Sequence, residues 1–200
     1  MPDMIRGVEF AIQCAWEKFS LTFAFDAGTS DTRSNAELQA VYNAFQTWAA
    51  VVSLAFTEVA LDESPDIVVG WRPARDPDHN MAGGVVAHAD FPPECSIIST
   101  GLPLPLHFDD SEHIWAISAV AGAFDIETVA LHEIGHLLGL GHSRVAGSVM
   151  FPSVSDDYTR RVLSADDISG IRLSTPSPEN SFCTAMRRRL VIYAYLFWIH

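Results

Sequence analysis

The first part of the chain alternates between a strand pattern and a helix pattern. Residues 21–26, LTFAFD, alternate in polarity and are rich in aromatic side chains, which predicts a β-strand. Across residues 35–50 the apolar side chains recur at helical spacing, so this segment is predicted to form an amphipathic helix. Ser34 or Asn35 is expected to cap that helix, because short polar side chains accept hydrogen bonds from the free N–H groups at a helix N-terminus.

Two further strands are predicted before a region rich in loops. Residues 54–59, LAFTEV, and residues 66–71, DIVVGW, both have the composition of strands. Residues 72–113 carry many prolines and glycines and should be mostly loop. Short strands are expected within this region at GVVAHA, residues 84–89, and at LHF, residues 106–108.

The last third of the chain is predicted to hold two helices. Asp125 should cap a helix through residues 127–138, ETVALHEIGHLL. The final helix should begin at SADD, where Ser164 and Asp167 form an acidic variant of the capping box. The polar, proline-bearing segment 174–181 is expected to end the domain. This order of elements indicates an α/β (α+β) fold.

Length and charge fit a single soluble domain and argue against a nucleic-acid partner. With 200 residues, of which 48% are hydrophobic, the chain can bury a core without covalent crosslinks. Its formal net charge of −13 disfavours binding to a phosphate backbone. The same charge is compatible with bound divalent cations, although it also simply favours solubility.

The two ends of the chain and its cysteines leave several interpretations open. The N-terminus lacks a convincing signal peptide, because Glu9 and Gln13 interrupt its short apolar run. The apolar stretch 190–199 is too short to span a bilayer, but with the arginines before it this tail could contact a membrane surface. One disulfide can form between partners that the sequence does not identify, and a free buried thiol is the default interpretation of each cysteine. The cysteines are Cys14, Cys95 and Cys183.

The stretch HEIGHLLGLGHS, residues 132–143, places three histidines and a glutamate within an apolar run. On a helix His132 and His136 project from one face, one turn apart, so their imidazole nitrogens can bind the same zinc ion. Glu133 would lie beside them, where its carboxylate can act on a metal-bound water as a general base. This HExxH pattern alone is of limited specificity.

The residues that follow make the pattern much more specific. Gly139 can adopt the left-handed conformation that ends a helix, and the turn would bring His142 to the same ion. Three protein ligands leave one position for water, which is typical of a catalytic zinc. Met150, in SVMF, fits the methionine turn of the extended HExxHxxGxxH motif. The alternative, buried core histidines, would explain one ring better than three at this spacing.

HEIGHLLGLGHS followed by SVMF resembles the metzincin zinc endopeptidases, and Ser143 after the third histidine is similar to the matrixin branch, the matrix metalloproteinases. Other segments also resemble a matrixin catalytic domain: 16–25, 44–59, 66–71, 83–93, 106–115 and 163–174. The resemblance covers residues 16–175 and implies a twisted, mostly parallel five-stranded sheet with three helices. It divides the chain into an N-terminal extension (1–15), a catalytic domain (16–175) and a C-terminal tail (176–200).

The resemblance also implies metal sites apart from the catalytic one. His88 and His107 match ligands of a structural zinc, whereas Asp109 and Glu112 match ligands of calcium, which prefers carboxylate oxygens. The remaining zinc ligands of the family lie in a His-x-Asp well before the AHA segment, but here the loop reads RPARDPDHNMAGG, with a different spacing. Its candidate ligands are Asp76, Asp78 and His79. For His79, a solvated loop residue is the alternative.

By the same resemblance, Ala87 and Pro152 would contact the substrate, and a peptide would bind in an extended form along the sheet edge near residues 84–89. Val154 stands where the family often has the tyrosine of a Pro-x-Tyr pocket wall. The segment before His107, ECSIISTGLPLP, is longer than usual. The propeptide motif PRCGxPD, which blocks the zinc in the family, has no match in this sequence.

The function implied by the resemblance is a zinc-dependent metalloendopeptidase, in which Glu133 is the general base and a zinc-activated water attacks the peptide bond. A protein or peptide substrate, a monomeric state and an extracellular, matrix-associated location are expected with it. The alternatives are a catalytically inactive zinc- and peptide-binding module, a cell-surface interaction module that uses the tail from Arg187, and another metzincin branch.

Overall fold

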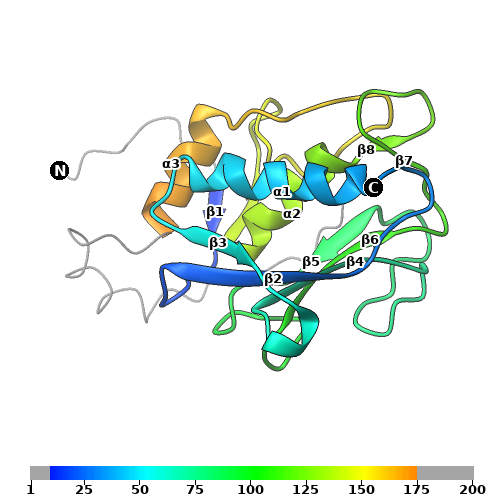
Figure 1. Cartoon of the computed structure of the whole chain (residues 1–200). Helices are drawn as coiled ribbons and strands as arrows, with labels where there is room; N and C mark the ends of the chain where they lie inside the picture. Colours follow the sequence, from blue (N-terminus) through cyan, green and yellow to red (C-terminus); the bar gives the residue numbers. More distant parts are fainter. Residues whose placement is uncertain (1–9, 175–200) are drawn as a thin grey trace.

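A computed structural model describes residues 10–174 of this chain. The tail 176–200, with Cys183 and the apolar stretch 190–199, lies outside the described residues. Helices α1 (Ala36–Ala49) and α2 (Ile126–Leu137) pack against each other on one side of the main sheet (Figure 1). Within the described range, no helix is both long and apolar enough to cross a membrane.

The main sheet has five strands in the order β3-β2-β4-β6-β5. Its strands are β2 (Ser20–Ala27), β3 (Ala55–Glu58), β4 (Ile67–Arg72), β5 (Ala87–Ala89) and β6 (Leu104–Asp109). All neighbouring pairs are parallel except β5 with β6, which are antiparallel. The expected fold class, a mostly parallel five-stranded sheet with three helices, is confirmed, and β5 forms one edge of the sheet.

The core explains why these segments form these elements. In β2 the inward side chains Leu21 and Phe23 are fully buried, as the alternation predicts. The apolar face of α1 is buried over the sheet, and Phe45 stacks on Phe23 with ring centroids 4.4 Å apart. Trp48 Nε1 donates a hydrogen bond of 2.9 Å to the carbonyl of Leu131, which ties α1 to α2. The sheet and α1 therefore form a rigid support for α2.

The helix caps agree with two of the three expectations. Asp125 caps α2, because its carboxylate accepts a 3.0 Å hydrogen bond from the N–H of Thr128. In the capping box of α3 (Ala165–Ser174), Ser164 N–H donates to Asp167 over 2.8 Å and Asp167 N–H donates back over 3.2 Å. The expected side-chain cap of α1 is wrong: Asn35 occupies the N-cap position with φ 57°, and no cap bond from its side chain is found in the described structure. Its left-handed backbone accounts for the difference, since a capping side chain normally requires an extended one.

Several short elements had no detectable sequence pattern. Strand β1 (Phe10–Ile12) pairs antiparallel with β9 (Leu140–Ser143), and β7 (Trp115–Ala116) pairs parallel with β8 (Phe124–Asp125). A 3-10 turn covers Leu61–Glu63. Elements of two to four residues are too short to show a period. Pairing with β9 shows that the described end of the N-terminal extension lies against the domain, while the domain boundaries themselves stay a prediction.

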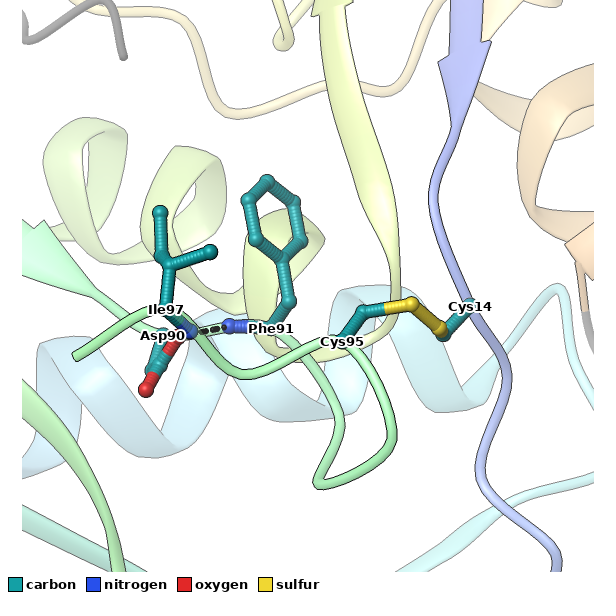
Figure 2. The surroundings of a disulfide bond; sticks show 5 residues. All are labelled: Cys14, Asp90, Phe91, Cys95 and Ile97. Atoms are coloured by element: carbon teal, nitrogen blue, oxygen red, sulfur yellow. Dashed lines mark hydrogen bonds between the residues drawn. A yellow bond between two sulfur atoms is a disulfide. The ribbon is translucent and has the colours of Figure 1, made fainter. Parts of the chain in front are cut away.

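A disulfide joins Cys14, just after β1, to Cys95 in the loop between β5 and β6 (Figure 2). The free-thiol interpretation is therefore wrong for these two cysteines. The loop that holds Cys95 is organised by the buried carboxylate of Asp90, which accepts hydrogen bonds from four backbone N–H groups and from the Ser96 hydroxyl. This long insertion is thus an ordered part of the domain.

Candidate metal centre and active site

Three histidines converge where α2 ends and β9 begins. His132 and His136 lie one turn apart on α2, and Gly139, with φ 95°, turns the chain so that His142 in β9 faces them. One ring nitrogen from each histidine lies within 4.8 Å of the others, and the Nε2 atoms of His132 and His136 are 3.1 Å apart. The predicted ligand set is therefore brought together in space.

The outer nitrogens of two of these rings are held by backbone carbonyls. His132 Nδ1 lies 2.7 Å from the carbonyl oxygen of Val149, and His136 Nδ1 lies 2.7 Å from that of Leu140. An Nδ1–H group that donates to a carbonyl leaves the Nε2 lone pair free for a metal. His142 Nε2 is buried and has no hydrogen-bond partner among the described residues. Three convergent imidazole nitrogens, one of them an unpartnered buried atom, fit a zinc ion.

Burial sets the protonation of this cluster. Burial, together with the proximity of the other two rings, holds the pKa of His132 well below its usual range. Burial likewise lowers the pKa of His136 to about 3 and that of His142 to about 4. All three rings are therefore neutral near neutral pH, which is the form that binds a metal.

Glu133 is the acid–base candidate beside the three rings. Its side chain is buried, with 2% of the residue exposed, and burial raises the pKa of its carboxyl group to about 8. A group whose pKa lies near the working pH is well suited to accept and return a proton.

Met150 packs against α2, the helix that carries His132 and His136. A Cβ atom on Gly135 would lie 2.2 Å from the sulfur of Met150, so the methionine packs directly against the helix backbone. Asp167 accepts hydrogen bonds from the N–H groups of Val149 and Met150, and Ser143 donates to Asp166 over 2.6 Å. Helix α3 thereby anchors both the methionine turn and the strand that carries His142.

A cavity of about 410 Å³ lies near the three histidines. Its walls are Phe151, Ser153, Val154, Ser155, Tyr158 and Arg160. A small recess shares Phe151, Ser153, Val154 and Arg160 with this cavity and reaches His132. The structure thus places Val154 in a pocket wall, as expected, whereas Pro152 is not among the described residues that line either space. Sequence reasoning missed Tyr158 and Arg160, because they follow an irregular loop without a recognisable pattern.

A second cluster joins His88 and His107 through Asp76. Asp76 Oδ2 lies 3.0 Å from His88 Nε2 and 2.6 Å from His107 Nδ1. Burial alone would raise the pKa of Asp76. Hydrogen bonds from His88 and from the backbone N–H of Asp78, together with the nearby His107, outweigh this effect and hold the pKa well below its usual range, so the carboxylate is ionised. The side chain of Asp78 is 54% exposed and lies 3.7 Å from His107, whereas that of Asp76 is fully buried. Of the three candidates in this loop, Asp76 therefore has the geometry of a shared ligand, while the ring of His79 lies 5.6 Å from that of His88.

A third cluster contains Asp109, Glu112 and His113. Asp109 Oδ2 is buried and, among the described residues, makes no hydrogen bond. Glu112 Oε2 accepts 2.9 Å hydrogen bonds from the N–H groups of Gly83 and Gly84. Both carboxylates expected to bind calcium thus lie together, with a histidine that the sequence analysis did not include.

Gly139 should be essential for this geometry. A Cβ atom there would lie 1.7 Å from the carbonyl oxygen of Cys14, and the backbone has a positive φ of 95°. Gly139→Ala is expected to lower the free energy of unfolding by about 2 kcal/mol or more, measured by urea denaturation. Gly147→Ala is the matched control, because a Cβ atom there would meet no described atom within 4 Å, and it should change stability by less than about 0.5 kcal/mol. Equal effects of the two substitutions would contradict the assigned close contact.

Comparisons with known proteins agree with this geometry. The profile of one protein family, Matrixin, matches residues 15–173. Metalloendoproteinase 5-MMP of Arabidopsis thaliana is 39% identical over 168 residues, covering 78% of this chain and 43% of the relative. Matrix metalloproteinase-26 of Homo sapiens is 34% identical, covering 80% of this chain and 59% of the relative. Interstitial collagenase of Bos taurus is 34% identical, covering 86% of this chain and 35% of the relative.

The chain therefore spans less than two thirds of the length of these relatives. The matched residues, 15–173, by contrast contain the main sheet, helices α1 and α2, all but the last residue of α3, and the three groups of candidate metal ligands described above. On this evidence, the chain belongs to the matrixin family.

Proposed function

We propose that this chain is the catalytic domain of a zinc-dependent endopeptidase. The observation that carries the proposal is the convergence of the ring nitrogens of His132, His136 and His142 beside the buried carboxyl of Glu133. One chain supplies all four groups, so the site does not need a second subunit, and we expect a monomer.

In this mechanism the three histidines would hold the zinc, which when bound polarises the scissile carbonyl and lowers the pKa of a coordinated water from about 15.7 towards about 7. Glu133 accepts the proton of the attacking water and then gives it to the leaving amine. The carbonyls of Val149 and Leu140 keep the rings of His132 and His136 in place.

An extended peptide is the substrate that fits the fold. β5 forms one edge of the sheet, and a peptide would add to that edge as a further strand. Ala87 and Ala89 belong to this strand, and α2 packs next to it. Ala87 and Pro152 remain candidate substrate contacts.

The crosslink supports an extracellular location for this chain. The disulfide between Cys14 and Cys95 favours an oxidising compartment, because such bonds are rare in the reducing cytosol. Matrix proteins are among the substrates to be tried.

The test combines elemental analysis of the purified chain with cleavage of a generic peptide, with and without a zinc chelator. Bound zinc and chelator-sensitive cleavage are expected. Bound zinc without cleavage would instead favour an inactive zinc- and peptide-binding module, and absence of zinc would exclude both.

The proposal extends to a structural zinc held by Asp76, His88 and His107. Asp76→Asn replaces a charged ligand by a neutral amide of the same shape, and it should reduce the zinc content after dialysis from two ions to one per chain, while cleavage persists. Elemental analysis would check this against Asp78→Asn, whose exposed side chain should be dispensable. Two zinc ions retained by Asp76→Asn would contradict the assignment.

Calcium is the cation proposed for Asp109 and Glu112. The unpartnered Oδ2 of Asp109 and the carboxylate of Glu112 are hard oxygen donors of the kind that calcium prefers. His113 is a nitrogen donor, which calcium does not favour, and it is left out of the proposed ligand set.

A further inference from the structure

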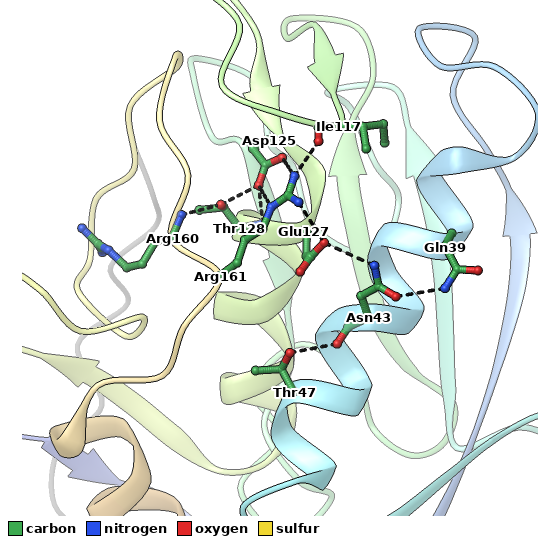
Figure 3. Close-up of polar contacts among 9 residues, drawn as sticks. All are labelled: Gln39, Asn43, Thr47, Ile117, Asp125, Glu127, Thr128, Arg160 and Arg161. Atoms are coloured by element: carbon green, nitrogen blue, oxygen red, sulfur yellow. Dashed lines mark hydrogen bonds and ion pairs between the residues drawn. The ribbon is translucent and has the colours of Figure 1, made fainter.

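Two neighbouring arginines after the cavity loop have very different surroundings. The guanidinium of Arg161 pairs with both oxygens of Asp125, at 2.5 and 3.0 Å, and with Glu127 at 3.2 Å. Its charge is therefore neutralised at the N-terminus of α2. The side chain of Arg160 points the opposite way, away from these carboxylates (Figure 3).

Among the described residues, the hydrogen bonds of the Arg160 guanidinium all go to neutral oxygens. The guanidinium donates to the carbonyls of Ser148 at 2.7 Å and Ala146 at 3.1 Å, and to the hydroxyl of Tyr158 at 3.4 Å, and it lies over the ring of Tyr158 at 5.1 Å. Within residues 10–174, none of the ion pairs involves Arg160. A guanidinium has five N–H donors, so these contacts leave donors free for a ligand.

The position of this cation is as informative as its lack of a carboxylate partner. Arg160 lines both the cavity of about 410 Å³ and the recess that reaches His132. Phe151 and Val154 line the same two spaces together with Ser153, so the route from the histidines to the arginine includes apolar side chains on a wall of mixed polarity. A side chain that enters the cavity from the reacting centre would place its methylene groups on these walls and its end near the positive charge.

We propose that Arg160 is a specificity-determining residue that favours substrates with a glutamate side chain in this cavity. The inference rests on the proposed endopeptidase function and adds the chemical class of one substrate side chain. A carboxylate can accept bidentate hydrogen bonds from a guanidinium, whereas the isosteric glutamine brings no charge.

The experiment compares kcat/KM for peptides that carry glutamate or glutamine at each position from three before to three after the scissile bond. At one position the wild-type chain should prefer glutamate by about 2- to 5-fold, the range of a partly exposed ion pair. Arg160→Gln should reduce this ratio to about 1, and Arg160→Lys should keep it above 1. Arg160→Glu should shift the preference at that position to lysine.

Both peptides are cleaved by the same preparation, so the ratio does not depend on how much of a variant is folded or loaded with metal. Arg172→Gln is the control for net charge, because Arg172 is exposed on α3 and does not line the cavity, and it should leave the ratio unchanged. Cleavage of both peptides by the wild type with a ratio near 1 at every position, or an unchanged ratio in Arg160→Gln, would overturn the inference and leave the endopeptidase function standing. Failure of the zinc-loaded wild type to cleave any peptide would overturn both.

Discussion

Replacing Glu133 by glutamine is expected to lower kcat/KM for peptide hydrolysis by about 10²- to 10⁴-fold, the usual contribution of a general acid–base group. Glutamine has nearly the same shape but cannot accept the proton of the attacking water. The three histidine rings, and the backbone carbonyls that hold two of them, are untouched by the change. Zinc content should therefore remain at the wild-type level.

Steady-state kinetics and elemental analysis on the same sample would check this result. Glu127→Gln is the matched control on the same helix, because Glu127 contacts Arg161 and Asn43 and not the three histidines. The kcat/KM of this variant should stay near that of the wild type. A Glu133→Gln chain that retains full activity with zinc bound would refute the role of Glu133 as the base.

Replacing His136 by alanine should abolish both zinc binding at this centre and activity, with a loss of about 10³-fold or more. Two imidazole ligands remain, and the hydrogen bond between His136 Nδ1 and the Leu140 carbonyl is lost. A metal that binds only the folded state stabilises that state. Zinc at about 1,000 times its Kd for this centre should therefore raise the free energy of unfolding of the wild type by about 4 kcal/mol. The His136→Ala variant should lack this stabilisation.

Thermal unfolding with and without added zinc would measure the difference. Glu133→Gln serves as the comparison, since it alters a buried neighbour yet keeps all three rings, and its Tm should rise with zinc as in the wild type. The cluster of Asp76, His88 and His107 contributes equally to both variants, so the difference between them isolates the catalytic centre. An equal rise in Tm for both variants would show that His136 is not a ligand.

The cluster of His132, His136 and His142 was predictable from the sequence because its geometry is local. The i and i+4 positions on α2 fix His132 and His136, and a single glycine turn at Gly139 brings in His142 only a few residues later. The longer strands of the main sheet, β2, β4 and β6, were predictable for a similar reason, since six to eight residues are enough to leave a recognisable strand pattern.

What could not be predicted depends on contacts between distant segments. The position of Asp76, and not Asp78, between the two histidines is set by the path of a loop, in which Asp76 accepts a hydrogen bond from the N–H of Asp78 and turns towards His88 and His107. The pairing of β1 with β9 and the place of Arg160 in the cavity likewise arise from tertiary packing. At Asn35, composition indicated a cap, but the left-handed backbone prevents it.

The disulfide has a consequence for the chain once its backbone is cut. Cys14 and Cys95 are 81 residues apart in sequence, and the segment between them includes α1 and four strands of the main sheet. A single nick anywhere in that segment, by another protease or by a second copy of this one, would leave two fragments that stay covalently joined. The nicked molecule would migrate as one band on a non-reducing gel and as two after reduction, so damage to this half of the domain would escape detection unless the sample is reduced.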